Sequence, residues 1–185
     1  MPLRIDTATG WIEGVRRIES PNFDARPPGC EPELIVIHGI SLPPGEFGGS
    51  GIDELFCNAL DPNAHPYFGQ ICHLRVSSHV LITRAGAVTQ YVSFQDRAWH
   101  AGESSYCGRR ACNDFSIGIE LEGTDDRGYE PEQYERLAQL VRALRATYAS
   151  LEQAELVGHS DIAPGRKTDP GPHFDWDLLR RRAEA

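Results

Sequence analysis

The sequence lacks long apolar runs and has few basic residues. No segment approaches the ~20 apolar residues that a membrane-spanning helix needs. The 185 residues carry 18 basic and 27 acidic side chains, for a formal charge of −9. This balance is unfavourable for binding nucleic acid, because phosphate contacts require clustered Lys and Arg. No apolar stretch follows the first basic residue, so we expect no secretory signal, no membrane or nucleic-acid partner, and a cytoplasmic location.

A disulfide framework is also missing from the pattern of cysteines. There are five of them, an odd number, and no two form a Cys-x-x-Cys pair. Without a secretory signal, this pattern favours free thiols, most of them buried. If all five are free, any metal ligands must come from histidines and carboxylates.

What is present is a series of short strands, followed by a helix, a further strand and a last helix. The region 131–151 starts with Pro131 and carries apolar residues at spacings of three and four, which predicts an amphipathic helix. A last helix over 174–182 begins near a capping residue, Asp175. Further expected elements are strands at 34–38, 78–83, 88–92, 115–122 and 156–159, and a helix at 52–60. The order predicts an α/β (α+β) single domain over 1–185, with a mixed central β-sheet flanked by helices.

Two histidines, His38 and His159, each close a short apolar strand. One such residue is weak evidence, but His159 is followed by a loop rich in Pro and Gly that reaches Asp169 ten residues later. Lys167 shares a face with Asp169 if the backbone is extended. Two imidazoles and one carboxylate form a known catalytic zinc set, which leaves a fourth position for water and lowers its pKa toward ~7.

A general base is expected on the strand 115–122. Glu120 and Glu122 both face away from its apolar side, and alternation alone cannot separate them. The role of the base is to take a proton from the attacking water. Lys167 is the candidate for stabilising the oxyanion, with Arg166 as the weaker alternative.

Three other residues compete as metal ligands. His79 and His100 lie beside apolar residues, and we interpret both as pocket-lining or hydrogen-bonded side chains. Asp161 follows His159 by only two residues. We favour Asp169 over it because the turn-forming loop leads there.

Two residues are candidates for substrate binding. The planar guanidinium of Arg75 suits a peptide carboxylate, although a surface ion pair is as good an interpretation. Trp99 offers a ring that stacks on a sugar, and a core tryptophan is the alternative.

Several segments resemble the N-acetylmuramoyl-L-alanine amidase family, also called amidase type 2. They are H-G-I-S-L-P-P-G-E-F-G-G, L-R-V-S-S-H, W-H-A-G, N-D-F-S-I-G-I-E-L-E-G and G-H-S-D-I-A-P-G-R-K-T-D-P-G-P, and the likeness runs over about 10–176. It is strongest to the cytoplasmic members that act on 1,6-anhydromuropeptides. One departure is Gly39, where asparagine is expected in the most similar members. The loss of the asparagine side chain would weaken a contact to the substrate or to a metal ligand without removing the metal.

The resemblance implies the chemistry of the site. It implies Zn²⁺ at His38, His159 and Asp169, with Glu120 and Lys167 as the catalytic pair. The implied reaction cuts the amide between the lactyl group of 1,6-anhydro-N-acetylmuramic acid and L-alanine of the stem peptide, in cell-wall recycling. The substrate is a small muropeptide, and no obligate protein partner is indicated.

Two other functions remain to be weighed. Recognition proteins of the same fold bind peptidoglycan fragments without cutting them, and they typically lack part of the zinc set. An unrelated enzyme with a structural zinc site is the third possibility, but such sites usually have four protein ligands, often cysteine.

Overall fold

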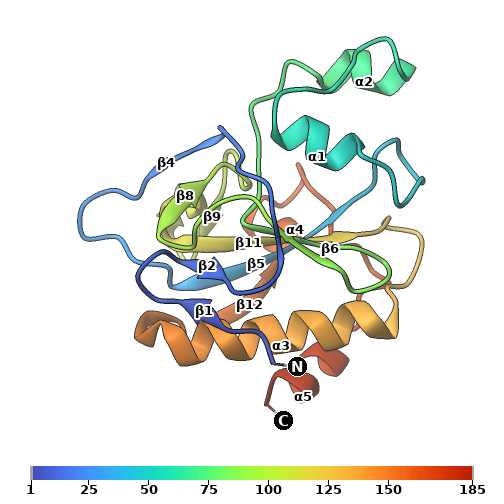
Figure 1. Ribbon diagram of the computed structural model, residues 1–185. Coiled ribbons are helices and arrows are strands. Elements are labelled where there is room, and N and C mark those ends of the chain that lie inside the picture. The colour runs from blue at the N-terminus through green and yellow to red at the C-terminus, as the bar shows by residue number, and fades with distance from the viewer. Residues whose placement is uncertain (1, 185) are drawn as a thin grey trace.

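A six-stranded sheet lies at the centre of the computed structural model, which describes residues 2–184 (Figure 1). The order is β12-β5-β11-β6-β7-β3, and the first four strands run parallel, whereas β7 is antiparallel to β6. This confirms the predicted mixed sheet. The strands are β3 (Arg16–Arg17), β5 (Leu34–Ile40), β6 (Val80–Ile82), β7 (Val88–Gln90), β11 (Ser116–Glu122) and β12 (Glu155–Gly158).

Three short antiparallel pairs lie outside this sheet. They are β1 (Ile5–Asp6) with β2 (Trp11–Ile12), β4 (Phe23–Ala25) with β8 (Asp96–Ala98), and β9 (Ser105–Tyr106) with β10 (Arg109–Arg110). Among residues 2–184, none of the helices combines the length and apolar character needed to cross a bilayer.

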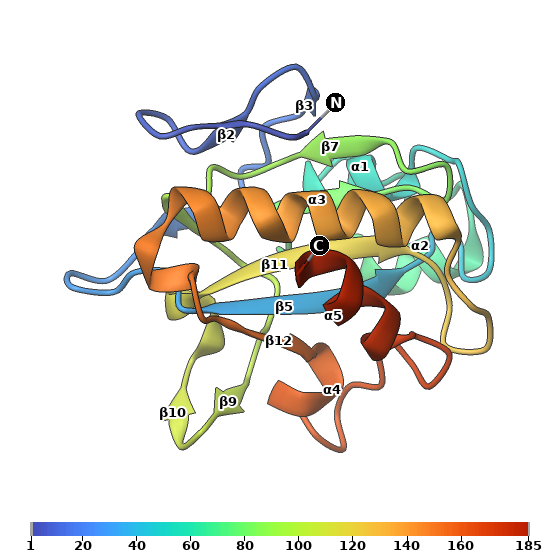
Figure 2. The ribbon, with the colours of Figure 1, turned by 90° about the horizontal axis from the view of Figure 1, so that it is seen from below.

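Helices α3 (Pro131–Thr147) and α5 (Trp176–Glu184) cover one face of the sheet (Figure 2). α3 begins at Pro131, as expected, and the Gln133 side chain accepts a hydrogen bond from the backbone of Glu130. It ends four residues earlier than predicted, because Tyr148 has extended backbone before the 3-10 turn η2 (Ala149–Leu151). α5 is preceded by the expected cap, with Asp175 accepting from the backbone N–H of Leu178.

The opposite side of the sheet carries short helices and long loops. α1 (Gly51–Phe56) is shorter than the predicted 52–60, because Asn58 adopts the left-handed conformation (φ 59°) just beyond it. α2 (Pro66–Ile71) was not predicted, and both helices stand above the sheet in Figure 1. η1 (Cys112–Phe115) leads into β11, and α4 (His159–Ile162) follows β12.

All five cysteines are free, as expected. The expectation that most of them are buried is wrong. Only Cys112 is buried, whereas Cys107 is exposed and the other three are partly exposed. The thiols therefore belong largely to loops and helix ends rather than to the core.

Candidate metal and catalytic site

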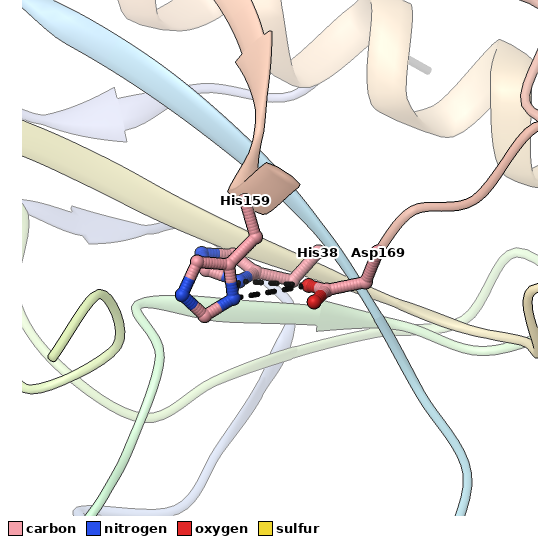
Figure 3. Close-up of side chains that lie close together, drawn as sticks. All are labelled: His38, His159 and Asp169. Carbon is pink, nitrogen blue, oxygen red and sulfur yellow. Dashed lines mark hydrogen bonds and ion pairs between the residues drawn. The ribbon is translucent and has the colours of Figure 1, made fainter. Parts of the chain in front are cut away.

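Three side chains from separate segments point at one another (Figure 3). Nδ1 of His38 lies 3.0 Å from Nδ1 of His159 and 3.3 Å from Oδ2 of Asp169. The His159 Nδ1 lies 3.1 Å from the same oxygen. In a tetrahedral zinc site with ligands at 2.0–2.1 Å, the ligand atoms are ~3.3 Å apart. The donor set therefore has the chemistry and spacing that a zinc ion requires.

Adjacent parallel strands bring the two histidines together. Val157 of β12 pairs with Val36 of β5, and His159 and His38 each lie two residues further along the chain. The prediction that each histidine ends a strand is wrong in detail. β5 continues to Ile40, two residues past His38, whereas β12 ends at Gly158 and His159 is the first residue of α4. The turn into α4 aims the imidazole back toward β5.

Two hydrogen bonds hold the loop that carries Asp169 next to His159. The Ser160 N–H donates to the carbonyl of Asp169 over 3.0 Å. The Tyr129 hydroxyl donates to the carbonyl of Pro170 over 2.9 Å. A Cβ at Gly39 would lie 2.4 Å from that hydroxyl. Gly39 thus makes room for the Tyr129 hydroxyl, a contact that the sequence alone does not predict.

Electrostatics favour the protonation states that bind a cation. Burial lowers the pKa of His38 to about 4, so its imidazole is neutral near pH 7. Burial raises the pKa of Asp169, but hydrogen bonds to His159 and His38 outweigh burial and hold this pKa below its usual range. A neutral imidazole and an ionised carboxylate are the ligand forms that metal binding selects.

Glu120 and Glu122 differ although they lie on the same face of β11. Glu122 accepts backbone N–H groups from Gly48 and from Arg84, the latter over 3.0 Å. Oε2 of Glu120 is buried and has no hydrogen-bond partner. Burial, and then the charge of Asp169, raise the pKa of Glu120 well above its usual range. Glu120 is therefore the carboxylate that is available for proton transfer.

Lys167 and Arg166 are also separated by their contacts. Arg166 donates to the carbonyls of Ala101 and Glu103, each over 2.6 Å, and so fastens a loop. Lys167 lines the cleft described below, and its charge lowers the pKa of Glu120 in opposition to burial. It is the only lysine in the sequence.

Comparison with known proteins matches this site to a family. Residues 28–172 match the N-acetylmuramoyl-L-alanine amidase family. The chain belongs to this family. The amidase is 58% identical over 171 residues to 1,6-anhydro-N-acetylmuramyl-L-alanine amidase AmpD of Escherichia coli K12, covering 92% of this chain and 93% of the relative. The predicted enzyme class, a hydrolase of an amide bond, is thereby confirmed.

Solved structures of related amidases have the same fold. A crystal structure of an AmpD derivative has a TM-score of 0.92 at 56% identity and covers 96% of this amidase and 98% of that chain. A complex of Escherichia coli AmiD with anhydro-N-acetylmuramic acid-L-Ala-D-γ-Glu-L-Lys has a TM-score of 0.59 at 27% identity. It covers 98% of this amidase and 65% of that chain.

A cleft of about 500 Å³ opens over His38, His159 and Asp169 of the amidase. Its polar end includes Glu120 and Lys167. Its apolar wall comes mainly from α1, α2 and the loops around them, and consists of Ile40, Leu42, Leu55, Phe56, Tyr67, Ile71, Leu74 and Val76. The cleft thus joins a reactive polar end to a surface suited to a larger ligand.

The two residues suggested for substrate binding lie outside this lining. Arg75 is exposed and sits between two lining residues, with weak bonds to nearby carbonyls such as that of Leu74 over 3.3 Å. The Trp99 indole N–H donates to Asp24 over 3.1 Å. The geometry keeps Arg75 at the rim, whereas it gives Trp99 a structural contact and does not support its stacking on a sugar.

The competing ligand candidates are occupied elsewhere. His79 is fully buried and bonds to the Gly118 N–H over 3.0 Å. Asp161 accepts the Gly158 N–H over 2.7 Å and so caps α4. His100 lines the cleft and lies 2.9 Å from Nε2 of His38, on the side away from Asp169. None of these atoms joins the cluster of three ligands.

Proposed function

We propose that this amidase uses a zinc ion to hydrolyse the amide between the lactyl group of 1,6-anhydro-N-acetylmuramic acid and L-alanine of the stem peptide. The observation that carries the proposal is the convergence of His38, His159 and Asp169 beside the unpartnered oxygen of Glu120. The relative at 58% identity acts on that bond by its name, and AmiD is described with such a muropeptide as substrate.

The three residues His38, His159 and Asp169 would hold the ion. When bound, zinc supplies Lewis acidity, which lowers the pKa of water toward ~7 and polarises a carbonyl group. The cluster contains no thiol, so a structural site built on cysteine has no support among residues 2–184.

Glu120 moves the proton. It lies at the polar end of the cleft, and its raised pKa makes it a stronger base than a solvated carboxylate. We assign to it the removal of a proton from the attacking water and the return of that proton to the leaving amine of L-alanine. Burial of the carboxylate disfavours its charged form, and the charge of Lys167 partly offsets that penalty.

Lys167 stabilises negative charge on the reacting carbonyl. Its ammonium is a compact charge on a flexible stem, which suits an oxygen whose charge grows during the reaction. The other basic candidate, Arg166, has donors engaged by two backbone carbonyls. At the rim, we propose that Arg75 pairs with a carboxylate of the stem peptide.

We also propose a role in the cytoplasmic recycling of cell-wall fragments. A 1,6-anhydro ring occurs on a sugar whose glycosidic bond has already been cut, so such a substrate is a product of earlier cleavage of the cell wall. Fractionation of cells tests the compartment. Accumulation of anhydromuropeptides in cells that lack the enzyme tests the role.

The decisive experiment measures zinc and activity together. We expect about one zinc ion per chain in the wild type, and release of free peptide from an anhydromuropeptide by mass spectrometry. Asp169→Ala should lose both. Asp161→Ala is the matched control, because Asp161 caps α4 outside the cluster and its loss should leave zinc and activity in place.

Two outcomes would contradict the proposal. A zinc-loaded wild type that binds the muropeptide and releases no peptide would indicate a non-catalytic recognition protein. A full zinc content in Asp169→Ala would show that the ion is held elsewhere.

A further inference from the structure

A row of hydrogen bonds runs from His38 on its side away from Asp169. Nε2 of His38 lies 2.9 Å from Nδ1 of His100. Nε2 of His100 lies 3.1 Å from the Ser116 hydroxyl oxygen, and that hydroxyl lies 2.6 Å from the carbonyl of Cys112. All four residues are at least 92% buried, so no bulk water replaces these partners.

The chemistry of the last group sets the direction of the whole row. A carbonyl only accepts, so the Ser116 hydroxyl donates its proton to Cys112 and is left with lone pairs for His100. His100 therefore carries its proton on Nε2 and presents a lone pair on Nδ1. His38 donates from Nε2 to that lone pair, which leaves its own Nδ1 unprotonated and aimed at Asp169.

His159 reaches the same state by a shorter path. Its Nε2 lies 3.2 Å from the carbonyl of Ala101, which can only accept a hydrogen bond, so Nε2 carries the proton. Its Nδ1 is then also a lone pair directed at Asp169. One ligand is oriented by a backbone carbonyl and the other by a relay of two side chains that ends on a carbonyl.

The strand that carries Ser116, β11, also provides the space for the His100 ring. A Cβ on Gly118 would lie 2.4 Å from Cγ of the imidazole, so any larger residue there displaces the ring. Ser116, Gly118 and Glu120 alternate along one face of β11. Burial also holds the pKa of His100 well below its usual range, which agrees with a neutral ring.

We propose that His100 is a positioning residue, and that Ser116, through His100, fixes the tautomer of His38 so that Nδ1 faces the metal position. In the metal-free protein the relay competes with the Asp169 oxygen, which lies 3.3 Å from His38 Nδ1 and 3.1 Å from His159 Nδ1 and favours a proton on those atoms. The inference rests on the proposed function in assigning that position to zinc. The proton positions themselves concern the metal-free protein and are tested without zinc.

The first test reads the tautomers by nitrogen-15 NMR of the histidine rings in metal-free protein at about pH 7.5. We expect His38 and His100 to be protonated on Nε2 and unprotonated on Nδ1. Ser116→Ala removes the acceptor for His100 and should move its proton to Nδ1, which in turn shifts the proton of His38. Ser78→Ala is the matched control, since Ser78 is also fully buried but bonds to the Gly118 carbonyl.

The second test measures zinc affinity by competition with a chelator. His100→Leu keeps the bulk without an acceptor and should weaken zinc binding by about 10- to 100-fold. His100→Asn retains an oxygen near the position of Nδ1 and should recover a large part of that loss. Ser78→Ala should bind zinc as the wild type does.

The outcomes separate the two proposals. A wild type that binds no zinc refutes the proposed function, whereas the tautomers remain measurable. Protonation of His38 on Nδ1 in the metal-free wild type overturns the relay, whatever the variants do. Wild-type affinity in His100→Leu would also overturn it, and if that variant does not fold, the Ser116→Ala spectrum decides.

Discussion

The two faces of the central sheet use the same strands for different purposes. Toward α3, β5 and β11 present only apolar side chains, and Ile35, Ile37, Ile117, Ile119 and Leu121 are all fully buried there. On the opposite face, β5 carries His38 after Leu34 and Val36, which belong to a separate apolar cluster, and β11 carries serine, glycine and two glutamates. Stability and chemistry are thus assigned to opposite sides of one backbone, a separation that the period of two makes possible.

Polar groups on the cleft face have to find partners, and one does not. Glu122 satisfies both carboxylate oxygens with backbone N–H groups, whereas Oε2 of Glu120 has none. Burying such a group without a partner is costly. The comparison shows that Glu122 joins two loops to β11, and it supports the proposal that Glu120 takes part in the reaction.

The largest difference in activity should appear when Glu120 and Glu122 are each replaced by glutamine in separate variants. Glu120→Gln should lower kcat by about 10²–10⁴, because it removes the base while keeping the shape. Glu122→Gln should leave kcat of the folded fraction unchanged and lower the free energy of unfolding by about 1–3 kcal/mol, because an amide N–H₂ then faces a backbone donor. Steady-state kinetics and denaturant titrations measure both. Equal losses of kcat would contradict the division of roles.

The next effect concerns Lys167. Lys167→Met should lower kcat by about 10²–10³, the typical cost of losing one oxyanion stabiliser. Lys167→Arg keeps the charge but carries a planar, forked head, so we expect it to restore little activity. Because Lys167 is the only lysine, reductive methylation of the intact enzyme modifies this side chain and the α-amino group alone. Full activity in Lys167→Met would remove the lysine from the mechanism.

The two faces of the sheet also differ in how far the sequence predicts them. The apolar face was predictable, because alternation in 115–122 and the stripe of α3 are local patterns that burial enforces. The ligand set came from the spacing of His159 and Asp169, and from resemblance. Alternation could not separate Glu120 from Glu122, because the difference lies in N–H groups from distant loops.

The relay behind His38 was out of reach for the same reason. His100 was interpreted as hydrogen-bonded, but its partner Ser116 lies sixteen residues away and its space depends on Gly118. A glycine in the middle of a strand is a signal of close approach by another group. The contact between Gly39 and Tyr129 is a second example, because it joins residues that lie far apart in the sequence.

The apolar face should respond in the opposite way to the catalytic one. Ile119→Ala should lower the free energy of unfolding by about 2–5 kcal/mol, because it leaves a cavity beneath α3. Activity per folded molecule should persist. Leu74→Ala is the contrasting variant: Leu74 is 39% exposed and lines the cleft, so KM should rise with little change in stability. A fall in kcat for folded Ile119→Ala would show that the two faces are coupled.

The smallest effect is a pH dependence of stability caused by Glu120. Its pKa is raised in the folded protein by burial first and by Asp169 second, so the folded state binds a proton that the unfolded chain has already released. The destabilisation of the folded state by Glu120 is therefore smallest below the unfolded pKa of about 4.5. Its penalty grows as pH rises toward the folded pKa and is constant above it. In metal-free protein, Glu120→Gln lacks the titration. Relative to the wild type, its free energy of unfolding should increase as pH rises from 4.5 and then level off. A constant difference between the two proteins across this range would mean that burial does not raise the pKa of Glu120 in the folded protein.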